Sequence, residues 1–171
     1  MALHRIYYYD AEPLDAIKPK PLTGGRNNWE LYNFASNPLF HSNMQLLEDL
    51  KKRPYFAVRL GDVSFRGWSV KPQTLNPRDT ITSRTITSED LIPNVQQKGV
   101  DMRIGLDIAS LTLKNQVDVI VLITGDSDFI PALKFARREG KQVFLYTLAH
   151  GIKPEIYAHA DLCIENSQET L

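Results

Sequence analysis

The chain has 171 residues, 20 basic and 20 acidic side chains, and one cysteine. This length suits a single domain with one hydrophobic core, and the zero net charge excludes a whole-molecule attraction to nucleic acid or membranes. One cysteine excludes an intramolecular disulfide and a cysteine-rich zinc site, and the four histidines lack metal-ligand spacing. No apolar run reaches the ~18 residues of a membrane span, and no signal-peptide core follows the N-terminus. We therefore expect one cytoplasmic domain over residues 1–171, with no membrane partner.

Short β-prone segments and loops fill the first half of the chain. The aromatic run at residues 6–9 predicts a first strand. Residues 11–28 predict a loop, because they hold three prolines together with paired glycines and paired asparagines. Apolar residues at helical spacing predict a helix over residues 43–52, with Ser42 as its N-cap.

Residues 55–87 contain further β-prone segments. Residues 55–60 and 63–70 predict two strands, with Asp62 in a turn between them. Residues 71–80 are polar and hold prolines, which indicates a loop. The Thr/Ile-rich residues 80–87 predict an edge strand or an extended arm.

The last third gives the clearest pattern. Residues 101–114 predict a helix that is apolar on two sides, which is typical of a buried layer. Residues 117–123 are almost all β-branched and apolar, as in a central parallel strand covered by helices on both faces. Residues 129–138 predict a helix, and residues 142–146 predict the next strand. This alternation predicts an α/β fold with a mostly parallel sheet.

Aspartates follow two of these strands. Asp10 ends the first strand, and Asp126 and Asp128 follow the strand at 117–123. Ligands of α/β sheets bind at the carboxyl ends of the strands, so we expect these carboxylates to converge, with Asp101 pointing the same way. Converging carboxylates repel unless a cation neutralises them, and hard oxygen ligands favour Mg²⁺ or Mn²⁺.

A purely structural interpretation fits some of the same residues. Asp126 and Asp128 are equally suited to be a helix N-cap and a first-turn acid. Asp101 also fits a helix cap, and Asp118 lies at the entry of its strand, away from the expected site. Asp107 follows Asp101 by six positions, about 9 Å of rise and about 240° of rotation, so the two cannot easily chelate one ion.

Several short motifs combine into one resemblance. They are Lys98-Gly99-Val100-Asp101, then Asp107, then Thr124-Gly125-Asp126-Ser127-Asp128-Phe129, then Gly140-Lys141 and Ala160-Asp161. This set closely resembles the NYN domain family of the PIN-like nuclease superfamily. The resemblance covers residues 95–166 and the first strand.

The resemblance implies a three-layer α/β/α sandwich and a metal-dependent, RNA-cleaving site. It implies that the family's acidic positions are Asp10, Asp101, Asp126 and Asp128, with Asp107 as a further acid. Residues 60–95 match no part of the family's core, and we interpret them as a β-rich insertion.

One position departs from the family pattern. The family often has Asp-Gly-x-Asn after its first strand, whereas this chain has Asp10-Ala11-Glu12-Pro13. The asparagine is missing, and Glu12 or Asn27 and Asn28 are candidates to replace it.

Basic and aromatic residues are interleaved between positions 51 and 84. The basic residues are Lys51, Lys52, Arg53, Arg59, Arg66, Lys71, Arg78 and Arg84, and the aromatic residues are Tyr55, Phe56, Phe65 and Trp68. This pattern suits single-stranded nucleic acid, and it equally suits a solvated strand face with core aromatics. We expect Lys98, close to Asp101, to bind a phosphate, and Thr124 and Ser127 to contact the substrate.

The leading hypothesis is an endoribonuclease that uses Mg²⁺ or Mn²⁺ and acts on single-stranded or structured RNA. The alternative is a catalytically weak PIN-like module that binds RNA or a protein partner, which the missing asparagine favours. A phosphatase or DNA nuclease with the same metal chemistry also fits the carboxylates. An edge arm at 80–92 suits pairing with a second chain, so a homodimer is a further expectation.

Overall fold

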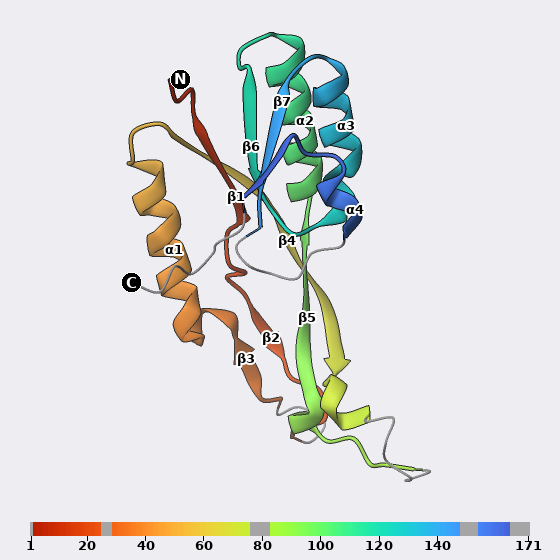
Figure 1. Cartoon of the computed structure of the whole chain (residues 1–171). Coiled ribbons are helices and arrows are strands. Elements are labelled where there is room, and N and C mark those ends of the chain that lie inside the picture. The colour runs from red at the N-terminus through yellow and green to blue at the C-terminus, as the bar shows by residue number, and fades with distance from the viewer. Residues whose placement is uncertain (1, 25–28, 76–82, 148–153, 165–171) are drawn as a thin grey trace, which may run out of the picture. The chain divides into compact units, whose positions relative to one another are not determined.

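The chain divides into two compact units, an N-terminal unit (Met1–Val100) and a C-terminal unit (Asp101–Leu171). The computed structural model describes residues 2–24, 29–75, 83–147 and 154–164 (Figure 1). Among these residues no helix has the length and apolar character needed to cross a membrane. The cytoplasmic location stays a prediction.

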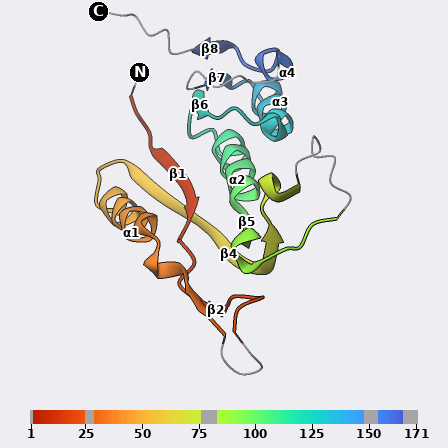
Figure 2. The same ribbon diagram turned by 90° about the horizontal axis from the view of Figure 1, so that it is seen from below.

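The N-terminal unit is organised around one long strand. Strand β4 (Phe56–Val70) pairs in parallel with β1 (Ile6–Ala11) along its first part and antiparallel with β5 (Leu91–Lys98) along its second part. The strand order is therefore β1-β4-β5, and Figure 2 shows β1 lying beside β4. The predicted first strand is confirmed, and it extends two residues further, so that Asp10 lies within it.

The expectation of two strands separated by a turn at Asp62 is wrong. Asp62 lies inside β4 and pairs with Lys98 of β5, so the strand continues because both of its halves have a partner. Strand β5 is not visible in the sequence pattern, since Pro93 and two glutamines weaken the β signal. Pro93 pairs with Trp68 at a shift in the ladder register, a place where proline is tolerated in a sheet.

A second, two-stranded sheet and a helix complete this unit. Strands β2 (Ile17–Pro19) and β3 (Leu31–Asn33) are antiparallel, so part of the predicted 11–28 loop is a strand. Helix α1 (Pro38–Lys51) begins earlier than predicted, because Asn37 is its N-cap. Ser42, the predicted cap, instead donates from its hydroxyl to the carbonyl of Leu39.

Helix α1 packs against β4 through a face that includes the buried Leu47. The segments that join these elements contain 3₁₀ turns, namely η1 (Phe34–Ser36), η2 (Pro72–Leu75) and η3 (Ser88–Asp90). Residues 83–87 form no strand. The remainder of the predicted edge arm, residues 80–82, lies outside the described residues.

The C-terminal unit follows the predicted alternation of helices and strands. Its elements are α2 (Val100–Leu113), β6 (Val119–Ile123), η4 (Ser127–Phe129), α3 (Ile130–Arg138), β7 (Gln142–Tyr146), α4 (Pro154–Tyr157) and β8 (Leu162–Ile164). The three strands are parallel in the order β6-β7-β8. Pro131 lies in the first turn of α3, and Gly140 follows the helix with a φ of 83°, as expected for a C-terminal stop.

One face of this sheet carries the core of the unit. The buried cluster contains Ile108 of α2, Ile120 of β6, Leu133 and Ala136 of α3, Val143 and Leu145 of β7, and Ile156 of α4. The other side of β6 is different, since Val121 and Ile123 are exposed. Strand β6 is thus an edge strand of this sheet, not the central strand that the sequence predicts.

Helix α2 also differs from its expected environment. Ile108 is buried, but Met102, Leu106 and Leu113 are exposed. Only one of the two predicted apolar stripes is therefore covered within this unit.

The α/β class is confirmed, and the finer architecture is not. The described residues form three small sheets, one mixed, one antiparallel and one parallel. A single, mostly parallel sheet between two helical layers is not confirmed. Residues 60–95 are β-rich, since they contain parts of β4 and β5, but both strands extend beyond these bounds. That the segment is an insertion stays a prediction.

Candidate active site

The turn after β6 holds Asp126 in a cap position. The Thr124 amide donates to the Tyr146 carbonyl at 3.1 Å, which fixes the end of β6 to β7. The Asp126 amide donates to Thr124 Oγ1 at 3.1 Å, and Asp126 Oδ1 accepts from the Asp128 amide at 2.9 Å. The expected N-cap role of Asp126 is therefore present, at the start of η4.

This cap uses only Oδ1 of Asp126 among the carboxylate oxygens of Asp126 and Asp128. Asp126 and Asp128 are both exposed. Within the described residues no hydrogen bond or ion pair engages Asp126 Oδ2 or either carboxylate oxygen of Asp128. The turn, whose backbone is held by Thr124, therefore has three carboxylate oxygens without a partner among the described residues. Ser127 lies half-buried between the two acids.

The acids of α2 lie at different heights on one helix. Asp101 is exposed in the first turn, where a negative charge complements the helix dipole. Asp107 is half-buried, six positions later. Because the helix is continuous, the separation of about 9 Å along its axis that the sequence predicts applies.

Asp10 is held by three donors within the N-terminal unit. The Tyr8 hydroxyl donates to Asp10 Oδ2 at 3.2 Å, and the Ala11 amide donates to Oδ1 at 2.8 Å. The Gln97 carboxamide nitrogen donates to the same Oδ1 at 3.3 Å. Burial, the charge of Asp10 and this hydrogen bond raise the pKa of the Tyr8 hydroxyl. Tyr8 therefore stays protonated and remains a donor to the carboxylate.

Strands β1 and β5 end beside the same two residues of β4. Ala11 pairs with Gly61, and Lys98 pairs with Asp62. A Cβ atom at Gly61 would lie 2.6 Å from both the Lys98 carbonyl oxygen and Val100 Cγ2. The close approach therefore requires glycine, and it packs the chain at Lys98 and Val100 against β4. The side chain of Lys98 is exposed at this end of the sheet.

Gln97 contacts Asp10, and the sequence does not predict this contact. Of the expected replacements for the missing asparagine, Glu12 lies 3.7 Å from Lys51 Nζ in an ion pair. The other two, Asn27 and Asn28, lie outside the described residues. Gln97 supplies a carboxamide to Asp10 from 87 positions away, and no local spacing pattern marks such a pair.

Two of the aromatic residues proposed for nucleic acid pack against other rings of the N-terminal unit, as the alternative of core aromatics expects. Phe65 and Trp68 pack edge-on with Phe34 and Tyr32, respectively, at centroid distances of 5.7 and 5.5 Å. These rings hold the β2–β3 sheet against β4. Tyr55, in contrast, is exposed.

The basic residues proposed with them have mixed environments. Arg59 stacks over the Tyr7 ring at 5.5 Å, and Arg84 forms an ion pair with Asp90 at 3.2 Å. Arg78 lies outside the described residues.

The donor set suits a hard cation. The side chains of Asp10, Asp126 and Asp128 offer carboxylate oxygens, the ligands that Mg²⁺ and Mn²⁺ prefer. Within the described part of the chain, no three His, Cys, Asp or Glu side chains gather closely enough to hold a metal ion. The chemistry of the donors fits, and the convergence of all four acids stays a prediction.

Comparison with known proteins finds the following similarities. The sequence model of the NYN domain matches residues 45–166. An uncharacterized protein of Methanocaldococcus jannaschii is 26% identical over 84 residues, which cover 49% of this chain and 35% of that protein. The aligned stretch is thus about a third of the length of this relative. A protein of unknown function from Vibrio parahaemolyticus aligns in structure over 78% of this chain and 64% of its own, with 18% identity and a TM-score of 0.44.

Proposed function

The chain belongs to the NYN domain family, and from this premise we propose that it is a metal-dependent endoribonuclease. Family membership supports a nuclease-like function directed at RNA in general. The observation that carries the proposal is the turn after β6, where Asp126 and Asp128 keep three carboxylate oxygens without a protein partner among the described residues. A purely structural cap needs one of these acids.

We further propose that both units form one NYN domain with the three-layer α/β/α arrangement of its family. The matched segment runs across the boundary at Val100 and includes all of β4, all of β5 and the whole α2–β8 series. Asp10 precedes this segment. Its inclusion is supported by the pairing of β1 with β4, which lies inside the match.

In this proposal Asp10, Asp101 and Asp126 hold one Mg²⁺ or Mn²⁺ ion, and Asp128 holds it or orients the attacking water. When bound, the ion supplies an activated water and stabilises charge at the phosphorus. Asp107 supports the site as a further acid.

The remaining residues position these groups or contact RNA. Tyr8 and Gln97 hold the Asp10 carboxylate in one orientation through their hydrogen bonds. Lys98, exposed at the end of β5, binds a phosphate of the substrate. Thr124 and Ser127 contact the RNA from the turn after β6.

The test is cleavage of RNA in Mn²⁺ by the wild type, Asp126→Asn and Asp118→Asn. Asparagine at position 126 keeps an oxygen that can cap η4, so the fold is retained while the charge is lost. We expect a loss of activity of about 100-fold or more, as for residues that support a metal site. Asp118 is the matched control, because its side chain is fully exposed just before β6. Equal cleavage by Asp126→Asn and the wild type would refute this assignment.

A second candidate is a module that binds RNA or a protein partner without cleaving. Pro13 occupies the position where the family often carries asparagine, and its ring lines an apolar pocket. Tight RNA binding without turnover in any divalent metal would favour this candidate over the enzyme.

A further inference from the structure

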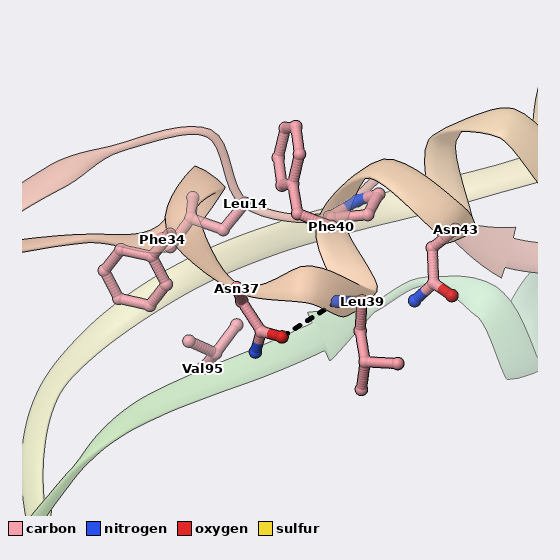
Figure 3. Close-up of a pocket in the computed structure, with 8 residues that line it drawn as sticks. Leu14, Phe34, Asn37, Leu39, Phe40, Asn43 and Val95 are labelled. Atoms are coloured by element: carbon pink, nitrogen blue, oxygen red, sulfur yellow. Dashed lines mark hydrogen bonds between the residues drawn. The ribbon is translucent and has the colours of Figure 1, made fainter.

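The N-terminal unit contains an open pocket of about 230 Å³. Figure 3 shows it between the start of α1 and strand β5. Its lining consists of Pro13, Leu14, Phe34, Asn37, Leu39, Phe40, Asn43 and Val95. Six of these eight side chains are apolar, and two of those six are aromatic.

The two polar residues of the lining are both carboxamides. Asn37 Oδ1 accepts from the Leu39 amide at 3.0 Å, which leaves its amino group available. Asn43 is exposed, and no hydrogen bond within the described residues engages its side chain. Figure 3 shows the two carboxamides on either side of Leu39. An apolar, partly aromatic wall with carboxamide groups beside it is the chemistry that recognises the face and the edge of an unstacked base.

The pocket lies close to Asp10 in the same unit. One connection runs along β5, and the other runs along the chain that follows β1. Val95 and Gln97 are two positions apart on β5, so their side chains lie on the same side of the strand, about 7 Å apart. Gln97 in turn donates to Asp10. Pro13 follows Asp10 by three positions, a span of at most about 11 Å. The pocket is therefore within the span of a dinucleotide from the carboxylate.

The charge of this unit complements a polyanion. Residues 1–100 contain 13 lysines and arginines against 10 aspartates and glutamates, whereas residues 101–171 have the reverse imbalance. A net positive charge together with a surface on which a base can stack is the combination found in proteins that bind single-stranded nucleic acid.

We propose that this pocket binds one unpaired nucleobase of the RNA, next to the phosphodiester that the Asp10 end of β1 approaches. The proposal rests on the proposed ribonuclease function and adds to it a preference for single-stranded RNA. The base stacks against the apolar wall, and the carboxamides of Asn37 and Asn43 contact its polar edge.

The test measures binding of a single-stranded oligoribonucleotide by fluorescence anisotropy in EDTA, with one abasic site moved along the strand. We expect the full-length wild type to lose about tenfold in affinity when the abasic site reaches the pocket position, since base stacking contributes on this scale. Loss of the base elsewhere should matter less.

Two substitutions of the exposed Asn43 test whether the base binds in this pocket. Asn43→Ala removes a carboxamide, and Asn43→Trp fills the space with an indole. We expect both variants to bind the intact strand more weakly. The loss of affinity that the abasic site causes should become smaller in Asn43→Ala and disappear in Asn43→Trp. Gln45→Ala is the control on the same helix, because Gln45 lies outside the lining and bonds to Asp49. It should keep the full abasic effect.

Three results would overturn the pocket assignment. They are an abasic profile without a sensitive position, a sensitive position that both Asn43 variants retain unchanged, and no measurable RNA binding. Cleavage in Mn²⁺ is measured separately with Asp126→Asn. Cleavage with a flat abasic profile rejects the pocket alone, and an abasic effect without cleavage rejects the nuclease alone.

Discussion

The Gln97 carboxamide donates a 3.3 Å hydrogen bond to the Asp10 carboxylate. This bond links the ends of β1 and β5 across β4, so it holds the orientation of an acid that we place in the metal site. Gln97 is a positioning residue in this account.

The first prediction concerns Gln97→Ala. The variant should lower Mn²⁺-dependent RNA cleavage about tenfold, because partners that orient a metal ligand contribute on this scale. The loss should appear as a higher Mn²⁺ concentration at half-maximal rate, with the KM for RNA unchanged. Gln96→Ala is the control, since the neighbouring side chain points to the opposite side of the strand. Equal metal dependence in both variants would contradict a positioning role.

The second prediction concerns two glycines with opposite surroundings. Gly61→Ala places a methyl group 2.6 Å from the Lys98 carbonyl and from Val100 Cγ2, so we expect a loss of about 1–3 kcal/mol in the free energy of unfolding. Gly105→Ala, within α2, meets nothing within 4 Å and should gain up to about 1 kcal/mol. Urea unfolding of both variants measures these changes. A neutral Gly61→Ala would show that the strands can separate without cost.

The third prediction concerns the hydrogen bonds that Asp161 accepts in the C-terminal unit. Asp161 Oδ2 accepts from the Val143 amide at 2.7 Å, and Oδ1 accepts from Arg137 Nε at 3.0 Å. Asp161→Ala removes both acceptors and leaves the amide of a fully buried residue unpaired, so unfolding should cost about 2 kcal/mol less. Asp118→Ala removes a fully exposed side chain that forms a 4.0 Å ion pair with Lys141, and it should change stability by less than about 1 kcal/mol. Similar free energies of unfolding for the two variants, measured in urea, would exclude a stabilising role of the Asp161 carboxylate.

The fourth prediction is a pH dependence at Asp90. The Thr87 amide and hydroxyl donate to its carboxylate at 2.9 and 3.0 Å, and these bonds, the amide first, lower the pKa of Asp90. A lowered pKa stabilises the fold above the ordinary aspartate value of about 3.9, and this contribution disappears as the pH falls through the folded-state pKa.

The measurement is thermal unfolding of the wild type and Asp90→Asn between pH 7 and pH 3. The wild type should be more stable by a constant margin down to about pH 5, and the margin should shrink below about pH 4. Glu89→Gln is the control, because its exposed side chain has no partner among the described residues. A margin that is the same at every pH would mean that the Asp90 charge is not involved.

The C-terminal elements could be predicted because their signals are local. The strand at 142–146 and the helix at 129–138 follow from periodicity, from Pro131 in the first turn and from Gly140 after the last. The turn at Asp126 could be predicted too, since an N-cap is a property of adjacent residues.

The N-terminal half could be predicted less well, because its structure depends on distant partners. Strand β4 passes through Asp62 without a turn because β1 and β5 each pair with one half of it. The bond from Gln97 to Asp10 spans 87 positions, and neither residue carries a local sign of it. The sequence therefore indicates the candidate acids, whose convergence stays a prediction, and does not indicate Gln97, which donates to one of them.

We propose centrally that Asp10, Asp101 and Asp126 hold one metal ion, with Asp128 holding it or orienting the attacking water. A crystal structure of the chain soaked in Mn²⁺, with anomalous diffraction to locate the ion, tests it most directly. We expect a manganese peak about 2.1 Å from carboxylate oxygens of both Asp10 and Asp126, with Asp101 or Asp128 completing the set. Manganese bound only at other acidic residues, with these four carboxylates far apart, would contradict it.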